Sequence, residues 1–281
     1  MAYYAVRCVM IISLLLGGCC FTPYRFNYLD EDRPRYLSST GYRKGISPGK
    51  NIKVVSYNIK YSRHPEALRL FKKEISLSDA DIICLQEMDI KSVKEIASYL
   101  DYNYVYYPSS HSSRCGRDFG PAILSKFPIE KTRKIMLPPY QEKKMYKIQR
   151  IAVIAQITLD SAPLTVVSTH LGVFISPDER ITQAETILDA LDGYPAPYII
   201  AGDFNTFNTR HRKAVSPVLA QAGFSLATSC VKWTYKHWYL FNKKALYDYI
   251  FVKGAAVKEC GYVADLKASD HMPIWAVLAL P

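Results

Sequence analysis

The sequence lacks the cysteine and histidine spacings that hold zinc or carry out dithiol chemistry. It contains 7 cysteines and 6 histidines in 281 residues, and none of them forms a CxxC pair or a Cys/His ligand pattern. A zinc ribbon and a redox motif are therefore disfavoured. Cys84 lies in an apolar run, which indicates a buried, inert thiol. Cys230 and Cys260 could pair in an oxidising compartment, but the sequence does not establish this bond.

The sequence also has no apolar run long enough to cross a bilayer as a stable anchor. Its N-terminal apolar stretch, Cys8 to Leu16, follows Arg7 and precedes small residues, which is typical of a cleaved export signal. The tetrapeptide Leu16 to Cys19 resembles a bacterial lipobox, which implies cleavage before Cys19 and lipidation of its thiol; a plain secretory signal is the alternative. We expect a signal peptide with this lipobox over residues 1–19, a tether over 20–50 and a folded domain over 51–281.

Runs of five or more like charges, repeats of fixed period and low-complexity segments are absent as well, which disfavours a solenoid or an array. Lys and Arg number 36 against 25 Asp and Glu, giving a formal charge of +11. This balance would attract polyanions or anionic membrane surfaces, although scattered lysines that only keep the protein soluble explain it equally well. With 49% hydrophobic residues, the chain is expected to form one packed domain.

Apolar periodicity predicts alternating strands and helices, followed by shorter strands in the middle of the chain. Strands are expected over 52–59, 81–86, 102–107, 121–125, 148–159, 164–168, 198–201, 247–252, 260–263 and 273–280, and helices over 65–77, 92–100 and 177–191. Ser176 is a suitable N-cap for the last helix, and Gly193 is placed to stop it. The pattern predicts an α/β fold with two packed sheets between helices, although one large mixed sheet is an alternative.

Polar and acidic residues recur where the apolar strands end. These segments are Ser56–Asn58, Gln86–Glu87, Ser168–His170, Gly202–Asn205, Tyr247–Tyr249 and Ser269–His271. Strand ends are rigid platforms for a functional site. Their carboxylates and amide suit a hard cation such as Mg²⁺ or Mn²⁺, whereas zinc would favour more His or Cys. Each segment alone could be a turn or a helix cap, so the combination carries the interpretation.

In this order, the segments resemble the endonuclease/exonuclease/phosphatase superfamily, which includes pancreatic deoxyribonuclease, exonuclease III-like repair nucleases, bacterial sphingomyelinases and inositol-phosphate phosphatases. The matching motifs are Ser-Tyr-Asn-Ile at 56–59, Leu-Gln-Glu at 85–87, Ser-Thr-His-Leu at 168–171, Gly-Asp-Phe-Asn at 202–205, Tyr-Asp-Tyr-Ile at 247–250 and Ser-Asp-His at 269–271. The resemblance covers most of residues 51–281, the expected catalytic domain. It implies a four-layered α/β sandwich of two packed mixed β-sheets flanked by helices, with the site where strand ends of both sheets meet.

The resemblance implies a metal site as well. Glu87 would be the principal ligand of Mg²⁺ or Mn²⁺, helped by Asn58 and Asp270.

Five further residues take catalytic roles by the same resemblance. Asp203 and Asn205 would orient the attacking water and contact the phosphate. His271, oriented by Asp248, would hydrogen-bond a phosphoryl oxygen or water. His170 would lie across the phosphate as a second donor or as the acid for the leaving group. Because the proton acceptor is disputed within the family, Asp203 as the base is our interpretation.

The chain departs from the family pattern in places. Met88 and Asp89 follow Glu87 where deoxyribonuclease-like members carry a basic residue, which weakens duplex DNA as the substrate. Arg117 and Asp118 lie where relatives often place a phosphate contact and a carboxylate partner for the first histidine. They are therefore candidate substrate-binding residues, with a solvated loop as the alternative.

Two other features have less specific interpretations. The stretch Trp233 to Phe241 combines aromatic residues with nearby lysines and could stack bases or touch a membrane or a lipid headgroup, although a half-buried hairpin is favoured. The remaining histidines have no motif context and are interpreted as structural; they are His64, His111, His211 and His237.

The sequence therefore predicts an exported, metal-dependent phosphoesterase, either a lipoprotein anchored at the cell envelope through Cys19 or a secreted protein. Its expected substrates are lipid headgroups or small phosphodiesters, with nucleic acid close behind, and we expect it to be a monomer. An extracellular nuclease is the first alternative. A binding or toxin-like module that has lost catalysis is the second, and the intact motifs argue against it.

Overall fold

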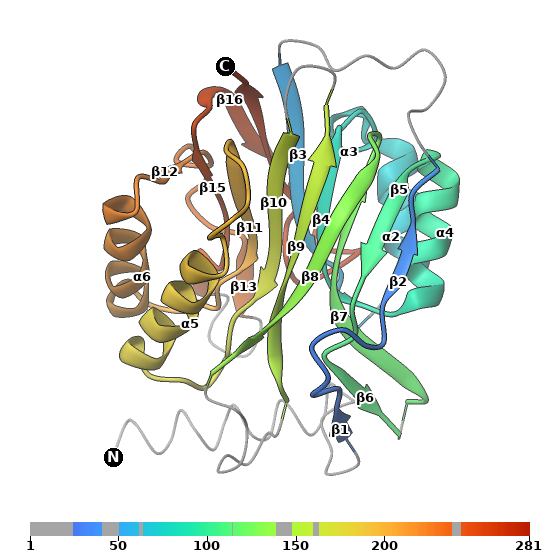
Figure 1. Ribbon diagram of the computed structural model, residues 1–281, viewed down its shortest axis with the longest axis horizontal. Coiled ribbons are helices and arrows are strands. Elements are labelled where there is room, and N and C mark those ends of the chain that lie inside the picture. The colour runs from blue at the N-terminus through green and yellow to red at the C-terminus, as the bar shows by residue number, and fades with distance from the viewer. Residues whose placement is uncertain are drawn as a thin grey trace.

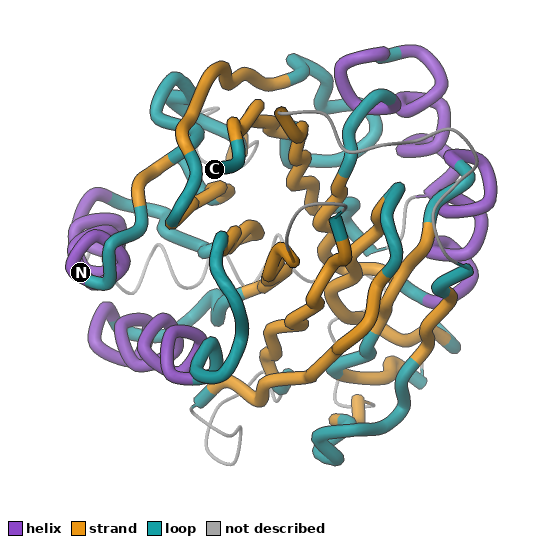
Figure 2. The backbone as a smooth tube through the Cα atoms, turned by 45° about the horizontal axis from the view of Figure 1, so that its top comes forward, coloured by secondary structure: helices purple, strands orange, loops and turns teal. Residues whose placement is uncertain are grey.

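A computed structural model of the protein describes residues 25–40, 51–61, 64–113, 115–138, 148–159, 163–237 and 243–281. The expected signal peptide lies outside these residues. Two large sheets pack face to face, and helices cover both outer faces (Figure 1). The tube in Figure 2 shows the same order of layers from a second direction. The four-layered α/β sandwich is therefore confirmed, and no helix in the described part of the chain is long and apolar enough to span a membrane.

The first sheet has nine strands, with the parallel pair β3 and β4 near its centre. Its strands are β1 (Arg25–Asn27), β2 (Tyr36–Ser38), β3 (Asn51–Asn58), β4 (Ile82–Met88), β5 (Asn103–Tyr106), β6 (Ser110–Ser112), β7 (Arg117–Ser125), β16 (Ala256–Tyr262) and β17 (Ile274–Ala279). Three helices cover its outer face: α2 (His64–Lys73), α3 (Ile75–Ser78) and α4 (Ile90–Leu100).

The second sheet has six strands in the order β12-β15-β11-β10-β9-β8, with β10 and β11 parallel. These strands are β8 (Ile129–Leu137), β9 (Arg150–Thr158), β10 (Pro163–His170), β11 (Tyr198–Asp203), β12 (Ser225–Leu226) and β15 (Asp248–Lys253). Its outer face carries α5 (Pro177–Asp189) and α6 (Thr209–Gln221), and β13 (Tyr235–His237) pairs with β14 (Lys243–Ala245) as a separate hairpin.

The inner strands are apolar on both faces because one face meets the other sheet and the opposite face meets a helix layer. In β4, Ile82 and Cys84 join the cluster between the sheets, whereas Ile83 and Leu85 join the cluster under α2 to α4. Cys84 is fully buried and is not in a disulfide, as its apolar surroundings predict.

Helix α5 begins as its sequence predicts. The Ser176 side chain accepts from the Glu179 backbone N–H, and the Glu179 carboxylate accepts from the Ser176 N–H, which completes a capping box. The helix ends at Asp189, however, and Gly193 lies in the turn beyond it with φ +77°. Helix α6, which was not predicted, starts from Asn208 as its N-cap and contains Pro217.

The prediction of a tether over residues 20–50 is wrong for residues 25–40, the part that the structure describes. Strand β1 pairs with β6, and β2 pairs with β5, so residues 25–27 and 36–38 belong to the first sheet. The buried ammonium of Lys134 donates to the carbonyls of Tyr28 (3.2 Å) and Arg33 (2.9 Å), which anchors this segment on β8. Its many polar residues suggested a tether, but their backbone groups are satisfied by these pairings.

Candidate active site

The polar segments converge because the strands that carry them end at one edge of the sandwich. Strands β10 and β11 run parallel, so His170 lies opposite Asp203 in the register. Strand β15 runs antiparallel to β11, which places its first residue, Asp248, opposite Asp203 as well. Across the two sheets, the Asn58 side-chain amide donates to Asp203 Oδ2 at 3.0 Å. Both sheets therefore contribute to one site.

Glu87 reaches this edge through an irregularity in β4. The register with β7 shifts between Leu85 and Met88, and Glu87 has φ +60°, a conformation that non-glycine residues seldom adopt. Its Oε1 accepts from Asn58 Nδ2 at 3.2 Å, and its Oε2 accepts from the Tyr61 N–H at 2.9 Å. Strained backbone of this kind is common where a side chain is aimed at a functional site.

Asp203 lies at the centre of the site and is almost fully buried. Its Oδ1 accepts from the Asn205 backbone N–H at 2.8 Å, while its Oδ2 lies 3.4 Å from His170 Nε2 and 3.7 Å from His271 Nε2. Burial raises the pKa of the Asp203 carboxyl to about 7; the charge of His271 lowers it and that of Asp248 raises it. This carboxylate can therefore accept a proton near neutral pH.

Asn205 is fixed beside Asp203 by a tight turn. It adopts φ +52°, which asparagine tolerates better than most residues. Its side-chain amide donates to the Leu171 carbonyl at 2.9 Å, which joins the loops that follow β10 and β11.

His271 and Asp248 form a buried pair, as the motif order implies. The Nδ1 of His271 lies 2.8 Å from Asp248 Oδ2, so Nε2 faces Asp203. Burial alone would lower the pKa of His271, but the charges of Asp248 and Asp203 outweigh it and raise the pKa to about 10. His271 is therefore an imidazolium at neutral pH. Asp248 Oδ1 is buried and has no hydrogen-bond partner among the described residues.

His170 has the opposite environment. Its Nδ1 lies 3.1 Å from Nη1 of Arg150, the first residue of β9. Burial, followed by the charge of Arg150, lowers the pKa of His170 well below its ordinary value. The imidazole is therefore neutral at neutral pH, so it suits a hydrogen-bond donor better than an acid for the leaving group.

The residues expected to bind metal are only partly assembled. Glu87 and Asn58 adjoin, but Asn58 turns its amide nitrogen toward Glu87 and its oxygen toward the Lys60 N–H. Asp270 forms an ion pair with Lys60 at 2.8 Å. A second oxygen-rich group is formed by Asp203, Asp248 and His271, whose ligand atoms lie within 4.8 Å of one another. Carboxylate and amide oxygens suit a hard cation, so the residues present fit Mg²⁺ or Mn²⁺.

The prediction that Asp118 is the carboxylate partner of the first histidine, His170, is wrong. Asp118 instead lies 2.7 Å from His111 Nδ1 and accepts from the Tyr28 hydroxyl at 2.9 Å. Arg117 is exposed, at the start of β7. The strands β6 and β7 place Asp118 opposite His111 in the register.

The half-buried hairpin is present in the stretch from Trp233, although residues 238–242 lie outside the description. Strands β13 and β14 pair, and Tyr235 packs edge-on against the His271 ring with centroids 4.8 Å apart. His237 hydrogen-bonds the Tyr247 hydroxyl at 2.9 Å, which agrees with its structural interpretation. The hairpin thus covers His271.

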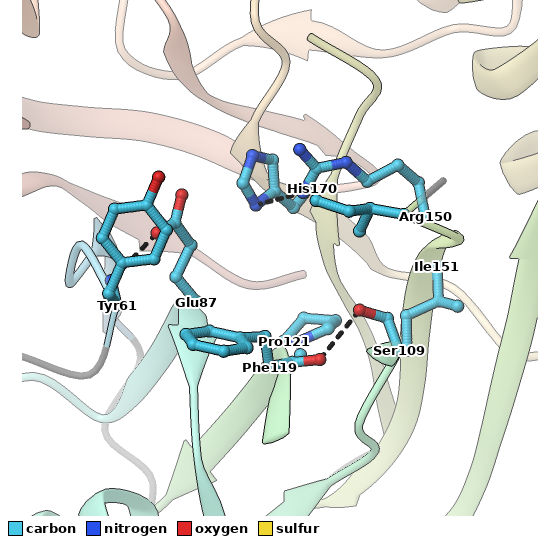
Figure 3. A pocket seen from close by; sticks show the side chains of 10 residues that line it. Tyr61, Glu87, Ser109, Phe119, Pro121, Arg150, Ile151 and His170 are labelled. Carbon is cyan, nitrogen blue, oxygen red and sulfur yellow. Dashed lines mark hydrogen bonds between the residues drawn. The ribbon is translucent and has the colours of Figure 1, made fainter. Parts of the chain in front are cut away.

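Sequence reasoning missed Arg150 and the small cavity beside it. The cavity has a volume of about 40 Å³ and is lined by Tyr61, Glu87, Ser109, Phe119, Arg150 and His170, among others (Figure 3). Arg150 opens a strand that is otherwise largely apolar, and this lone charge was the signal that could have revealed it.

Paired carboxylates, an amide and two histidines thus lie together at the shared edge of two packed sheets. The chain belongs to the Endonuclease/Exonuclease/phosphatase family, whose model matches residues 55–271.

The chain resembles two UPF0294 proteins of Vibrio vulnificus, VV2535 and VV1_1880, with 31% identity over 123 residues, which is 43% of this chain. The match spans only 42% of each relative. Among solved structures, it is similar to an endonuclease/exonuclease/phosphatase from Beutenbergia cavernae (TM-score 0.66, 17% identity, 82% of this chain and 72% of that one). It is also similar to D. rerio TDP2 complexed with single strand DNA product (TM-score 0.65, 16% identity, 82% and 99%).

Proposed function

We propose that this protein is an exported, divalent-metal-dependent phosphoesterase that hydrolyses a phosphodiester or phosphomonoester bond by attack of water. The observation that carries the proposal is the position of Asp203. Its carboxylate is buried, held by Asn58 and Asn205, and faces both histidines.

Each residue then has a separate role. Asp203 accepts a proton from water and aligns it for in-line attack, since burial raises its pKa toward neutrality. His271, kept protonated by Asp248, donates to a phosphoryl oxygen on which charge develops. His170 supplies a neutral donor from the other side, and the Asn205 amide fixes the loop between them.

Mg²⁺ or Mn²⁺ held by Glu87, with Asn58 beside it, would polarise a phosphoryl oxygen and help to neutralise its charge. Asp270 would join them only if its ion pair with Lys60 opened.

Export is supported by the Cys230–Cys260 disulfide, because such bonds persist in oxidising compartments. We further propose that the mature protein is a monomer anchored through a lipid on Cys19, with simple secretion as the alternative. Only five residues separate Cys19 from Arg25, which limits the reach from the anchor to β1 to roughly 20 Å. Strand β1 lies at the edge of the sandwich where β10 ends (Figure 1).

This proximity favours a substrate at the membrane surface, such as a lipid headgroup or a small phosphodiester. Two aromatic side chains on loops at the same edge are partly exposed: Phe174 after β10 (43%) and Phe207 after β11 (40%). Aromatic residues beside a basic protein surface suit contact with a lipid interface.

An extracellular nuclease is the second candidate. It is favoured by the net charge of +11 and by the likeness to TDP2 complexed with single strand DNA product.

The test is hydrolysis of sphingomyelin vesicles, an inositol phosphate, bis-p-nitrophenyl phosphate, single-stranded RNA and supercoiled DNA, with Mg²⁺, Mn²⁺ or EDTA. We expect EDTA-sensitive turnover that the Glu87→Ala and His271→Ala variants lose, with the lipid or small diester preferred. Faster cleavage of DNA or RNA would favour the nuclease. Binding of a substrate without turnover, unchanged in both variants, would favour the non-catalytic module and contradict the proposal.

A further inference from the structure

Cys115, in the turn between β6 and β7, is disulfide-bonded. Its partner is not one of the other cysteines that the structure describes, because Cys84 is free and Cys230 is bonded to Cys260. The sequence contains three further cysteines: Cys8, Cys19 and Cys20. One of these three is therefore the partner that has to be identified.

The export chemistry proposed above selects among them. Cleavage of the signal before Cys19 would remove Cys8 from the mature protein. A disulfide forms by attack of a free thiolate, so the sulfur of Cys19 cannot take part once it carries a lipid. Cys20, which like Cys19 lies outside the described residues, is then the remaining candidate.

The register of β1 agrees with this choice. Strand β1 runs antiparallel to β6, with Arg25 opposite Ser112, so its N-terminal end points toward the turn that follows β6 (Figure 1). In that turn the Cys115 N–H donates to the Ser112 carbonyl at 3.1 Å. Cys20 is five residues before Arg25 in the sequence, and such a segment reaches up to roughly 18 Å. The Cα atoms of bonded cysteines lie about 5.5–6 Å apart, which is well within this reach.

The β6–β7 hairpin connects Cys115 with the active site. At the end of the hairpin opposite the turn, the Ser109 N–H donates to the Phe119 carbonyl at 2.7 Å, and both residues line the cavity that holds Glu87 and His170 (Figure 3). Only four residues lead from Cys115 to Phe119, a span of at most roughly 14 Å. A bond at Cys115 would thus attach the N-terminal region to one wall of the active site.

We propose that Cys115 is bonded to Cys20 in the mature protein, and that this disulfide holds the lipid-bearing Cys19 beside the active-site edge, so that the site works at the membrane surface. The inference rests on the proposed export, lipidation and phosphoesterase function. Formation of the bond removes two protons and two electrons from the thiols, and a protein disulfide in the export compartment accepts them and becomes a dithiol. The Cys230–Cys260 bond requires the same oxidant.

The physical reason for such a bond is the weakness of β1. This strand has three residues and lies at the edge of its sheet, so on its own it would separate easily from β6 when the lipid anchor is pulled. A covalent bond from the residue after the anchor to the hairpin transfers that load to β7, which has nine residues.

The bond is tested first, because its detection does not depend on turnover. Full-length protein from the membrane fraction is treated with iodoacetamide and digested with trypsin without reductant. Mass spectrometry should find residues 19–25, with the lipid on Cys19, linked to residues 115–117, and reductant should separate them. In Cys20→Ser the link should be lost and Cys115 alkylated. Ser113→Ala, at an exposed position in the same turn, is the matched control and should keep the link.

The role of the bond is then tested by comparing two substrates. Lipidated Cys20→Ser and Cys115→Ser proteins, anchored in sphingomyelin vesicles, should hydrolyse the vesicle lipid about tenfold more slowly, because effective concentration depends on how the tether holds the site. Their rates on soluble bis-p-nitrophenyl phosphate should be unchanged, since neither residue belongs to the catalytic machinery. Thermal unfolding establishes that each variant is folded.

The bond is overturned if Cys115 is alkylated without reductant in the unaltered protein, or if it stays linked to the N-terminal peptide in Cys20→Ser. The anchoring role is overturned if both variants keep the vesicle rate of the unaltered protein. Linked peptides in a protein that hydrolyses no substrate would contradict the proposed function while confirming the bond, so the two failures are distinguishable.

Discussion

At the residue scale, Asp203 lies against four other groups of the site: Asn58, Asn205, His170 and His271. It is held by two neighbours and faces two imidazoles that differ in charge, because His271 lies against Asp248 and His170 lies against Arg150. A carboxylate in water would be a weak base, and burial is what raises its proton affinity.

Replacing Asp203 with Asn should therefore lower kcat by about 10²–10⁴-fold, since an amide of the same shape cannot accept the proton. The KM should change little because the phosphoryl contact proposed for His271 remains. Steady-state kinetics on bis-p-nitrophenyl phosphate measures both constants. Asp192→Asn, at an exposed position in the turn after α5, is the matched control, and an unchanged kcat in Asp203→Asn would contradict the assignment.

The rate should depend on pH in a bell shape. The reaction needs Asp203 deprotonated and His271 protonated, so kcat should fall as pH drops below about 7 and again as it rises past about 10. These apparent values belong to the coupled groups together. A pH–rate profile with saturating metal checks this, and a rate that stays flat from pH 5 to 8 would contradict it.

The buried Asp203 carboxylate should lower the free energy of unfolding at neutral and higher pH. A folded-state pKa above the unfolded one means that the stability linked to this proton is present below pH 4 and is lost as pH rises through about 7. Asp203→Asn should therefore be more stable than the unaltered protein at pH 8, by on the order of 2 kcal/mol, with a smaller gap at pH 5. Urea unfolding in EDTA at both pH values tests this. A variant that is less stable at pH 8 would show that Asp203 is stabilised by its neighbours.

The residues that sequence could locate are those at strand ends. Asn58, Asp203 and Asp248 follow or begin apolar runs, and strand order alone brings them together. The contact between Arg150 and His170 could not be predicted in this way. It joins the ends of the neighbouring strands β9 and β10, and only the structure shows which ring nitrogen the guanidinium contacts. Asp118 was misplaced for the same reason, since pairing of β6 with β7 decides its neighbour.

At the element scale, Gly202 allows β11 to approach β10. It has φ +151°, and a Cβ there would lie 2.0 Å from the Thr169 carbonyl oxygen. Gly202→Ala should lower the free energy of unfolding by more than about 2 kcal/mol, because the backbone at Thr169 would have to move rather than a flexible side chain. Gly193→Ala, which has φ +77° but open space around it, should cost only about 1 kcal/mol. Equal losses in urea unfolding would contradict the steric argument.

Strand β8 and helix α6 escaped prediction for physical reasons. Strand β8 lies at the end of its sheet, and its exposed Glu130 and Lys131 interrupt the apolar alternation. Helix α6 carries Pro217 and only a few buried residues, so its apolar periodicity is weak; its N-cap Asn208 and its packing on α5 hold it. The inner strands and α5 were predictable because burial on two faces, or a complete capping box, marks the sequence directly.

At the scale of the whole molecule, the N-terminal segment is part of the folded body. Besides the contacts of Lys134, the Thr40 N–H donates to Asn103 Oδ1 at 2.8 Å and the Gln149 N–H donates to Asn27 Oδ1 at 2.9 Å. Gln149 precedes Arg150, which lines the cavity at the active site.

A protein that starts at Asn51 should therefore be less stable than one that starts at Thr22, by at least about 2 kcal/mol. Removal leaves the buried Lys134 ammonium without its two carbonyl partners, and each lost partner costs roughly 1–3 kcal/mol. Urea unfolding of the two proteins compares them. Equal midpoints and slopes would show that residues 25–40 do not contribute to the fold.

Hydrolysis in ¹⁸O-labelled water examines the proposed chemistry of the whole molecule. With bis-p-nitrophenyl phosphate and Mg²⁺ or Mn²⁺, attack of water on phosphorus predicts one ¹⁸O atom in each p-nitrophenyl phosphate released and none in p-nitrophenol. EDTA should stop the incorporation, and Asp203→Asn should lower its rate by about 10²–10⁴-fold. Label in the p-nitrophenol, or an unchanged rate of incorporation in the Asp203→Asn variant, would contradict a hydrolase that uses Asp203 to activate water.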